Sequence, residues 1–259
     1  MRYRILLPVV LLALATTSFA GVVVVNAASF RPGEPVAAGS IASAYRSEGA
    51  PTKFPGVVST RFDGAPWPTQ LAGVRVLVND IACPLYFVSD DHMSFQVPGA
   101  LEPGKYPIKV ITATEEQDGM VTVMSAAPGI FADYSIDPPL GAVLNQDSSI
   151  NGENNPEQRG RALQVYATGP GKVDRPVADG EVAPSAEPYA RTISTPRVYI
   201  AGVEVPTADV IFSGLAPGLI GLWQVNFIIP DLPFITGRVP LSVYIDGVDS
   251  NEVSIFVAP

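Results

Sequence analysis

Four short sequence blocks of this chain occur twice, in the same order, and this duplication is the feature that most constrains its fold. Each copy is a little over a hundred residues long, which is the length of a domain that can build its own hydrophobic core. Two copies of one folded unit therefore account for most of the chain. The paired blocks are Gly39–Gly49 with Gly160–Gly171, Arg75–Ser89 with Arg197–Gly214, Ser94–Val110 with Asn226–Val243, and Met120–Pro128 with Glu252–Pro259.

Both copies consist of short apolar or alternating runs bounded by Gly, Pro, Asn and Asp. Runs of this kind, at a spacing of about 8–12 residues, are typical of antiparallel sandwiches and barrels. Asn79–Asp80 and Ala201–Gly202 hold the same place in the two copies and tolerate the positive φ of a tight hairpin. Pro98 and Pro230 have no N–H to donate, so each is expected to end a strand. We predict an all-β chain formed by a tandem of two Greek-key β-sandwiches.

The first twenty residues are predicted to be a signal peptide. Arg2 and Arg4 precede an apolar run, and Ser18 and Ala20 are small residues of the kind that precede a cleavage site. The run is too short and too lightly flanked for a stable membrane span, and no other stretch reaches the necessary length. An uncleaved N-terminal anchor is the alternative. We expect cleavage after Ala20, export of residues 21–259, and no membrane insertion of the exported chain.

The exported chain is expected to divide after residue 135. Residues 21–135 would form the first sandwich, and residues 136–259 would form a linker hairpin followed by the second sandwich. Pro138 and Pro139 favour an extended backbone and make the segment between the copies stiff. The hairpin that follows is expected to pack the two sandwiches together, so that they do not move freely.

Charge and cysteine content restrict the partners and the chemistry of the chain. Without Arg2 and Arg4, the exported part has 25 acidic and 14 basic residues, a net charge of −11. An acidic surface repels nucleic acid and anionic lipid, so neither is an expected partner. Cys83 is the only cysteine, so no internal disulfide can form and stability must come from packed apolar side chains. We interpret Cys83 as a buried, unreactive thiol rather than an exposed reactive one.

About a dozen motifs in order along the chain resemble those of a known family; among them are NAASF, GSIASAY, FQVP, APGIF, GAVLNQD, VYATGPG and LWQVN. The sequence from Val25 to Val257 is similar to the uncharacterised C-terminal domain first described in Solibacter, which is found at the ends of many exported acidobacterial proteins. Each half also resembles the immunoglobulin-like IPT/TIG module. The resemblance implies an exported tandem of two immunoglobulin-like (IPT/TIG-like) Greek-key β-sandwiches. It implies no catalytic residue, because the family has no assigned activity.

His92 is the only histidine, and it is not predicted to be catalytic. A serine triad needs a base that a carboxylate orients, and Asp90 and Asp91 are only its neighbours in sequence. We interpret His92 as a solvated residue of a variable loop. One histidine and one cysteine cannot supply the ligands of a zinc or copper site. We therefore predict no catalytic residue, no metal and no cofactor.

The one calcium candidate is an Asn- and Asp-rich segment. Asp147, Ser149 and Asn151 stand at positions 1, 3 and 5 of an EF-type loop, and Gly152 stands at position 6. Position 12 is Gln158 rather than a bidentate glutamate, and no helical pattern flanks the segment. Because Asn and Asp also satisfy their own backbone in turns, we interpret the segment as a turn.

Two further groups of residues offer alternatives to a purely structural role. Glu115, Glu116 and Asp118 lie between two predicted strands, where a hairpin tip usually carries solvated charge. A pair of carboxylates about 5–10 Å apart in a cleft would instead indicate a hydrolase. Trp67 and Trp223 are expected to pack in a core or between domains, because an indole buries a large area.

The loops between strands are the expected binding surface. Asp147–Arg161 and Lys172–Arg197 are long, and the second contains Tyr189 and has no counterpart in the first copy. The predicted function is a secreted, non-catalytic interaction or structural module of the cell surface or extracellular matrix, with the periplasm as an alternative compartment. Its partner would be a protein or a glycan, bound by these loops or by strand addition at a sheet edge. The alternatives are a carbohydrate-binding protein that uses exposed Trp67 or Tyr189, and a hydrolase that uses the carboxylates.

Overall fold

The computed structural model describes residues 21–47 and 53–259. The predicted signal peptide, residues 1–20, lies outside the described residues. Strands are the main regular structure of the described chain, and its one helical element is the 3₁₀ turn η1 (Thr207–Asp209). Within these residues no helix has the length and hydrophobicity that a membrane crossing requires.

The first sandwich has two sheets that face each other. The sheets meet along one side, where β1 forms a single parallel pair with β10 between Val22 and Gly119. The first sheet has the order β4 (Thr60–Arg61), β7 (Leu85–Val88), β8 (His92–Gln96), β3 (Ile41–Arg46) and β1 (Val22–Asn26). The second sheet has the order β2 (Val36–Ala37), β10 (Glu116–Met124), β9 (Gly104–Ile111), β5 (Arg75–Val78) and β6 (Ile81–Ala82).

The second sandwich repeats this plan. Its first sheet has the order β11 (Gly129–Ile130), β16 (Ala162–Thr168), β20 (Trp223–Ile228) and β19 (Val210–Leu215), with β14 (Val143–Leu144) also paired to β16. Its second sheet has the order β12 (Ala132–Asp133), β13 (Leu140–Gly141), β23 (Val253–Ala258), β21 (Gly237–Ile245), β17 (Arg197–Ile200) and β18 (Val203–Glu204), with β15 (Glu157–Gln158) beside β23 and β22 (Val248–Asp249) beside β21.

Equivalent strands of the two copies have the same neighbours. The order β3-β8-β7 corresponds to β16-β20-β19, and the order β10-β9-β5-β6 corresponds to β23-β21-β17-β18. This is the ABED and GFC arrangement of immunoglobulin-like sandwiches, in which the connections follow a Greek key. The fold is therefore a tandem of two immunoglobulin-like β-sandwiches, as the repeated blocks predict.

Each sandwich has a separate core of aliphatic and aromatic side chains. Phe54, Leu85 and Phe95 are fully buried in the first, and Trp223 and Phe227 are fully buried in the second. Burying one side chain of this size contributes about 1.5–3 kcal/mol, so these cores supply the stability that disulfides cannot. The Trp223 indole N–H donates to Ser213 Oγ at 3.0 Å, which confirms the predicted packing role of this tryptophan.

Cys83 also lies in the first core and is fully buried, as predicted. Burial disfavours the thiolate and raises the pKa of the Cys83 thiol to about 12. A thiol in this state is a poor nucleophile at neutral pH.

The hairpin turns and the strand ends follow the predicted signals. Asn79–Asp80 has φ values of 52° and 61°, and Ala201–Gly202 has φ values of 52° and 76°. Two consecutive positive φ values match the twist of the flanking strands, which is why these residue types recur there. Strand β8 ends two residues before Pro98, and β20 ends two residues before Pro230.

The connection between the sandwiches lies earlier in the chain than residue 135. Strand β11 pairs with β16, and β12 pairs with β13, so residues 129–135 belong to the second sandwich. Pro138 and Pro139 lie between β12 and β13, where the Pro139 carbonyl accepts from the Ser254 N–H at 2.7 Å. The segment predicted as a linker is thus a hairpin of the second sandwich, and the expected packing hairpin contributes β14 to the same sandwich.

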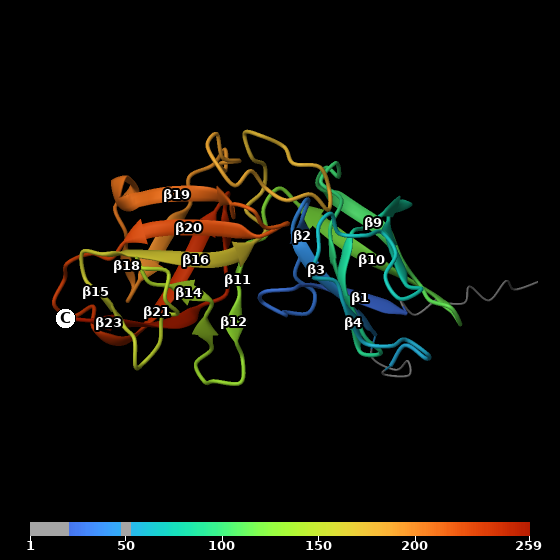
Figure 1. Ribbon diagram of the computed structural model, residues 1–259, viewed down its shortest axis with the longest axis horizontal. Coiled ribbons are helices and arrows are strands. Elements are labelled where there is room, and N and C mark those ends of the chain that lie inside the picture. The colour runs from blue at the N-terminus through green and yellow to red at the C-terminus, as the bar shows by residue number, and fades with distance from the viewer. Residues whose placement is uncertain (1–20, 48–52) are drawn as a thin grey trace, which may run out of the picture.

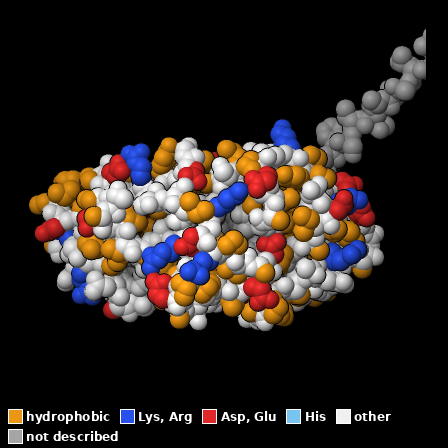
Figure 2. All heavy atoms as spheres, turned by 90° about the horizontal axis from the view of Figure 1, so that it is seen from above, with side chains coloured by type: hydrophobic (Ala, Val, Ile, Leu, Met, Phe, Trp, Pro, Cys, Tyr) orange, Lys and Arg blue, Asp and Glu red, His pale blue; other side chains and the backbone are white. Residues whose placement is uncertain are grey.

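The two sandwiches lie end to end along the long axis of the molecule, and the loops between β16 and β17 extend over their junction (Figure 1). We call the segment Lys172–Arg197 the insert. The first copy has a segment of similar length between β3 and β5, in contrast to the prediction, but its sequence differs. Seen from above, acidic and basic side chains are interspersed with hydrophobic ones, and no field of one charge covers this face (Figure 2).

Candidate functional site

The insert is attached to the first sandwich by hydrogen bonds to backbone and side-chain atoms. Gly180 provides two of these bonds, and its φ of 80° is a conformation that L-residues rarely adopt. The attachment fixes the middle of a long loop against the neighbouring domain. The bonds are Gly180 N to Gln96 Oε1 (2.7 Å), Trp67 N to Gly180 O (2.9 Å) and Gly99 N to Asp179 Oδ1 (2.9 Å).

Other buried hydrogen bonds join the two sandwiches beneath the insert. The Ile41 N–H donates to Thr168 Oγ1 at 2.8 Å, and that hydroxyl donates to the Gly221 carbonyl at 3.2 Å. The Asn26 side chain donates to the Ala127 carbonyl at 2.8 Å. Buried polar groups that pair with each other across a junction hold it in one geometry, because separation would leave them unpaired or expose them to water.

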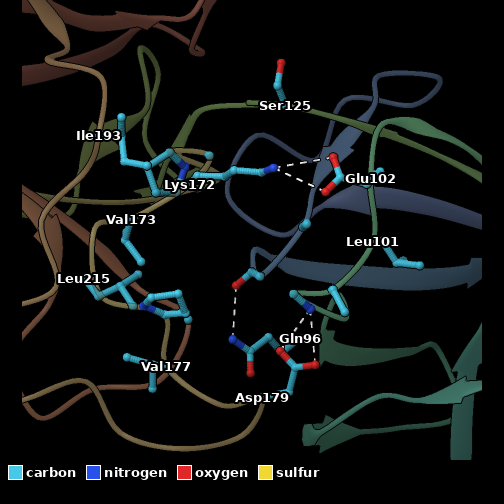
Figure 3. Close-up of a pocket in the computed structure, with 18 of the residues that line it drawn as sticks. Gln96, Leu101, Glu102, Ser125, Lys172, Val173, Val177, Asp179, Ile193 and Leu215 are labelled. Atoms are coloured by element: carbon cyan, nitrogen blue, oxygen red, sulfur yellow. Dashed lines mark hydrogen bonds and ion pairs between the residues drawn. The ribbon is translucent and has the colours of Figure 1, made fainter.

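An interdomain cleft with a volume of about 600 Å³ lies between the insert and the first sandwich. A volume of this size is within the range of ligand-binding clefts. Val173, Val177, Ile193 and Leu215 line its second-domain side (Figure 3). Pro103, Pro170, Pro176 and Met124 complete a lining that contains no aromatic side chain.

The charged groups of the interdomain cleft are mostly acidic. Lys172 reaches across the cleft to Glu102, with Nζ 3.2 Å from a carboxylate oxygen (Figure 3). Three more carboxylates line the cleft, those of Asp179, Glu181 and Asp246. Removal from water raises the pKa of the Asp179 carboxyl above its usual value, and the hydrogen bond from the Gly99 N–H acts in the opposite direction. One cation against four carboxylates favours a positively charged ligand.

A second cavity, the aromatic groove, is lined by other residues of both domains and has a volume of about 410 Å³. Its first-domain wall includes Trp67, Tyr86 and Phe62, and the Trp67 and Tyr86 rings stack at 4.9 Å with an interplanar angle of 29°. Its second-domain wall includes Val182 and Leu219, which are 42% and 45% exposed. Trp67 is therefore a partly exposed wall residue and not a core residue.

His92 is not a loop residue, in contrast to the prediction. It is the first residue of β8, and its ring stacks on Tyr45 at 5.0 Å and lies 5.0 Å from the Phe87 ring. Burial lowers the pKa of the His92 imidazole, and the nearby Asp91 carboxylate acts in the opposite direction. The sequence pattern around Ser89 predicted a variable loop at this place. The chain instead makes a tight turn there, so β8 begins earlier than the pattern indicated.

The acidic hairpin places each carboxylate beside a cation. Glu115 forms an ion pair with Arg46, whose side chain is almost fully buried, so this glutamate is not solvated as predicted. Glu116 lies 2.7 Å from Lys109 Nζ, and the Asp118 carboxylate lies 3.9 Å from the same nitrogen. Paired in this way, the carboxylates give no support to the hydrolase alternative.

The calcium candidate has the hydrogen bonds of a turn. Asp147 Oδ1 accepts from the N–H and the hydroxyl of Ser149, which lowers the pKa of the Asp147 carboxyl. Asn151 Oδ1 accepts from the Phe256 N–H at 2.8 Å, so this oxygen already has a partner. In the part of the chain that the structure describes, no three His, Cys, Asp or Glu side chains are close enough together to hold a metal ion.

Tyr189 packs within the insert and the second sandwich. Its ring meets Phe212 edge-on at 5.8 Å, and the Arg191 guanidinium lies 5.0 Å from the Phe212 ring. The predicted binding role of Tyr189 therefore has weaker geometric support than that of Trp67. Sequence reasoning did not single out Tyr86 or Gln96, since an aromatic residue and an amide in strands are ordinary core or edge residues.

Comparisons with known proteins assign this chain to no family. No family model and no curated protein matches the sequence. SGBP-B of the Bacteroides ovatus mixed-linkage glucan utilization locus, in complex with a mixed-linkage heptasaccharide, is 13% identical with a TM-score of 0.32, over 86% of this chain and 43% of that chain. Titin Ig tandem domains A164-A165 are 11% identical with a TM-score of 0.25, and the match covers 86% of this chain and 90% of the titin chain. Tandem Ig repeats of Dlar are 12% identical with a TM-score of 0.22, and the match covers 87% of this chain and 92% of the Dlar chain.

This chain spans less than half the length of the SGBP-B chain that it matches. Likenesses at this level carry no inference about a ligand, and the immunoglobulin-like topology of this protein stands on its own strand order. The resemblance to the Solibacter-type family stays a prediction.

Proposed function

We propose that this protein is a secreted, non-catalytic interaction module of the cell surface or the surrounding matrix, and that its main binding site is the interdomain cleft. The observation that carries the proposal is the insert, which forms one wall of the cleft while it is bonded to the other domain. Rigid domains that present such a loop hold their binding residues in place before the ligand arrives, which lowers the entropic cost of binding.

The cleft lining favours an extended protein segment as the ligand. Aliphatic and proline side chains suit aliphatic side chains of a partner, whereas the lack of aromatic rings provides no platform for a sugar. The excess of carboxylates over Lys172 favours a segment in which basic residues flank the aliphatic ones. Such a partner would bind more weakly as salt concentration rises, because part of the attraction is electrostatic.

A peptide array tests this proposal. Nonamers with an aliphatic centre, flanked either by Lys or by Glu, are probed with the purified protein, and the Lys-flanked series is expected to bind better. Ile193→Arg places a charge in the cleft at a side chain that is 66% exposed, and it should weaken binding at least tenfold. Ile150→Arg is the matched control, because Ile150 is 75% exposed and lies outside the cleft. Equal binding by both variants, or equal binding of both peptide series, would contradict the proposal.

A further inference from the structure

A β-bulge in β7 turns two neighbouring aromatic residues to the same face of the first sandwich. Leu85 pairs with Phe95 and Phe87 pairs with Ser94, so Tyr86 is the extra residue of the bulge. Leu85 and Val88 point into the core, which leaves the partly exposed Tyr86 and Phe87 on the outer face. Bulges often redirect side chains at functional sites, because they break the two-residue alternation of a strand.

The second sandwich has the same bulge, with Ile211 as its extra residue, and there the insert covers the neighbouring Phe212. The register of β19 shifts between Val210 and Phe212 in the same way. Phe212 is only 9% exposed, because Tyr189 and Arg191 of the insert pack against its ring. In the first sandwich Tyr86, which is equivalent to Ile211, is instead flanked by Trp67 and lines the aromatic groove.

The aromatic groove combines stacked rings with polar groups that are already paired. Trp67 and Tyr86 present ring surface, while the Arg61 guanidinium lies 2.6 Å from the Asp63 carboxylate at the same groove. A guanidinium and a carboxylate with remaining donors and acceptors can bond to hydroxyl groups without adding net charge. Val182 and Leu219 give the opposite wall an apolar surface.

We propose that the aromatic groove is a binding site for a neutral oligosaccharide, in which one pyranose ring lies against the Trp67–Tyr86 stack. Pyranoses with equatorial hydroxyls have flat C–H faces, which pack on aromatic rings, and an equatorial rim of hydroxyls, which Arg61 and Asp63 can reach. The net charge of the chain, −9, disfavours acidic sugars at the same place. The cavity volume of about 410 Å³ lies within the range of small-ligand sites. This site is separate from the interdomain cleft and does not depend on the function proposed there.

Tryptophan fluorescence gives a direct test. Trp223 is fully buried, so emission that acrylamide can quench comes mainly from the partly exposed Trp67. Cellopentaose and laminaripentaose are titrated into the wild-type protein, with an oligogalacturonate of the same length as the charged comparison. At least one neutral pentasaccharide is expected to protect Trp67 from acrylamide, and the oligogalacturonate is expected to protect it less. If neither neutral sugar protects Trp67 from acrylamide at millimolar concentration, the proposal is overturned.

Calorimetric titration of variants identifies the residues. Trp67→Ala is expected to lower affinity for the sugar about tenfold or more, because it removes the stacking surface. Tyr189→Ala is the matched aromatic control and should bind as the wild type does, and so should Ile193→Arg, which blocks only the interdomain cleft. Trp67→Phe keeps an aromatic stack and should retain part of the binding even if Trp67→Ala folds poorly. Unchanged affinity of a folded Trp67→Ala variant would contradict the site.

Discussion

Gly180 has a backbone conformation and a packing environment that other residues tolerate poorly. Its φ is 80°, and a Cβ atom there would lie 3.0 Å from the Trp67 carbonyl oxygen and 3.2 Å from the Pro84 side chain. A left-handed conformation alone costs a non-glycine residue roughly 1–2 kcal/mol. We therefore expect Gly180→Ala to lower the free energy of unfolding by about 2–3 kcal/mol, as measured by urea denaturation.

Gly202 provides the matched control for this substitution. Its φ is 76°, but no atom lies within 4 Å of the position of a Cβ. Gly202→Ala should therefore show only the cost of the left-handed conformation, and the difference between the two variants measures the contact with the first sandwich. Equal losses in the two variants would show that the close approach of Gly180 to Trp67 adds nothing to stability.

His92 makes the first sandwich sensitive to mild acid. Its pKa in the folded state is lowered by burial between Tyr45 and Phe87, whereas in the unfolded chain it has the ordinary value of about 6.5. As pH falls below that value, the unfolded state binds the proton first, so stability decreases until pH passes the lowered folded pKa. The urea midpoint should fall between pH 7.5 and pH 5.5 in the wild type. It should fall less in His92→Phe, which keeps an aromatic ring; the same decrease in both proteins would exclude His92 as the cause.

At the scale of elements, one of the bonds that attach the insert to the first sandwich is made by a buried side-chain amide of β8. Gln96 is 7% exposed, and it accepts from Gly180 and donates to the Gly39 carbonyl. Gln96→Ala removes both bonds, so the insert should detach more often. Trypsin should then cleave after Lys172 and Arg191 several times faster than in the wild type, as followed by mass spectrometry.

Gln224→Ala is the control for this experiment. Gln224 is also a buried strand glutamine, 9% exposed, but its side chain bonds to Asn226 of the same strand. Its substitution should leave cleavage of the insert unchanged. Acceleration in both variants would point to general destabilisation, and no acceleration in Gln96→Ala would show that the other bonds suffice to hold the insert.

The strands were predictable from sequence, whereas the attachment of the insert was not. Alternating runs and turn residues such as Asn79–Asp80 identify strands because they reflect local geometry. The insert is held mainly through backbone atoms of Gly180, Gly99 and Trp67, and backbone atoms leave no pattern in a sequence. The bulge at Tyr86 is similarly hidden, since it interrupts the alternation by which a strand is recognised.

At the scale of the molecule, the interdomain hydrogen bonds convert two self-sufficient sandwiches into one body. Each sandwich has its own core, so each could in principle unfold separately. The bonds from the insert, and those of Ile41 and Thr168 beneath it, connect the two. Composite sites such as the interdomain cleft and the aromatic groove exist only while this connection holds, because both domains contribute their walls.

Scanning calorimetry can detect this coupling. We expect the wild type to unfold in one transition, and a double variant with Gln96→Ala and Asp179→Ala to unfold in two, because each core then melts at its own temperature. Lys172→Ala is the control: it removes only an exposed ion pair across the same cleft, which is worth about 0–1 kcal/mol, and one transition should remain. A single transition in the double variant would mean that the buried bonds beneath the insert couple the sandwiches without it, and two transitions in the wild type would mean that the domains are independent.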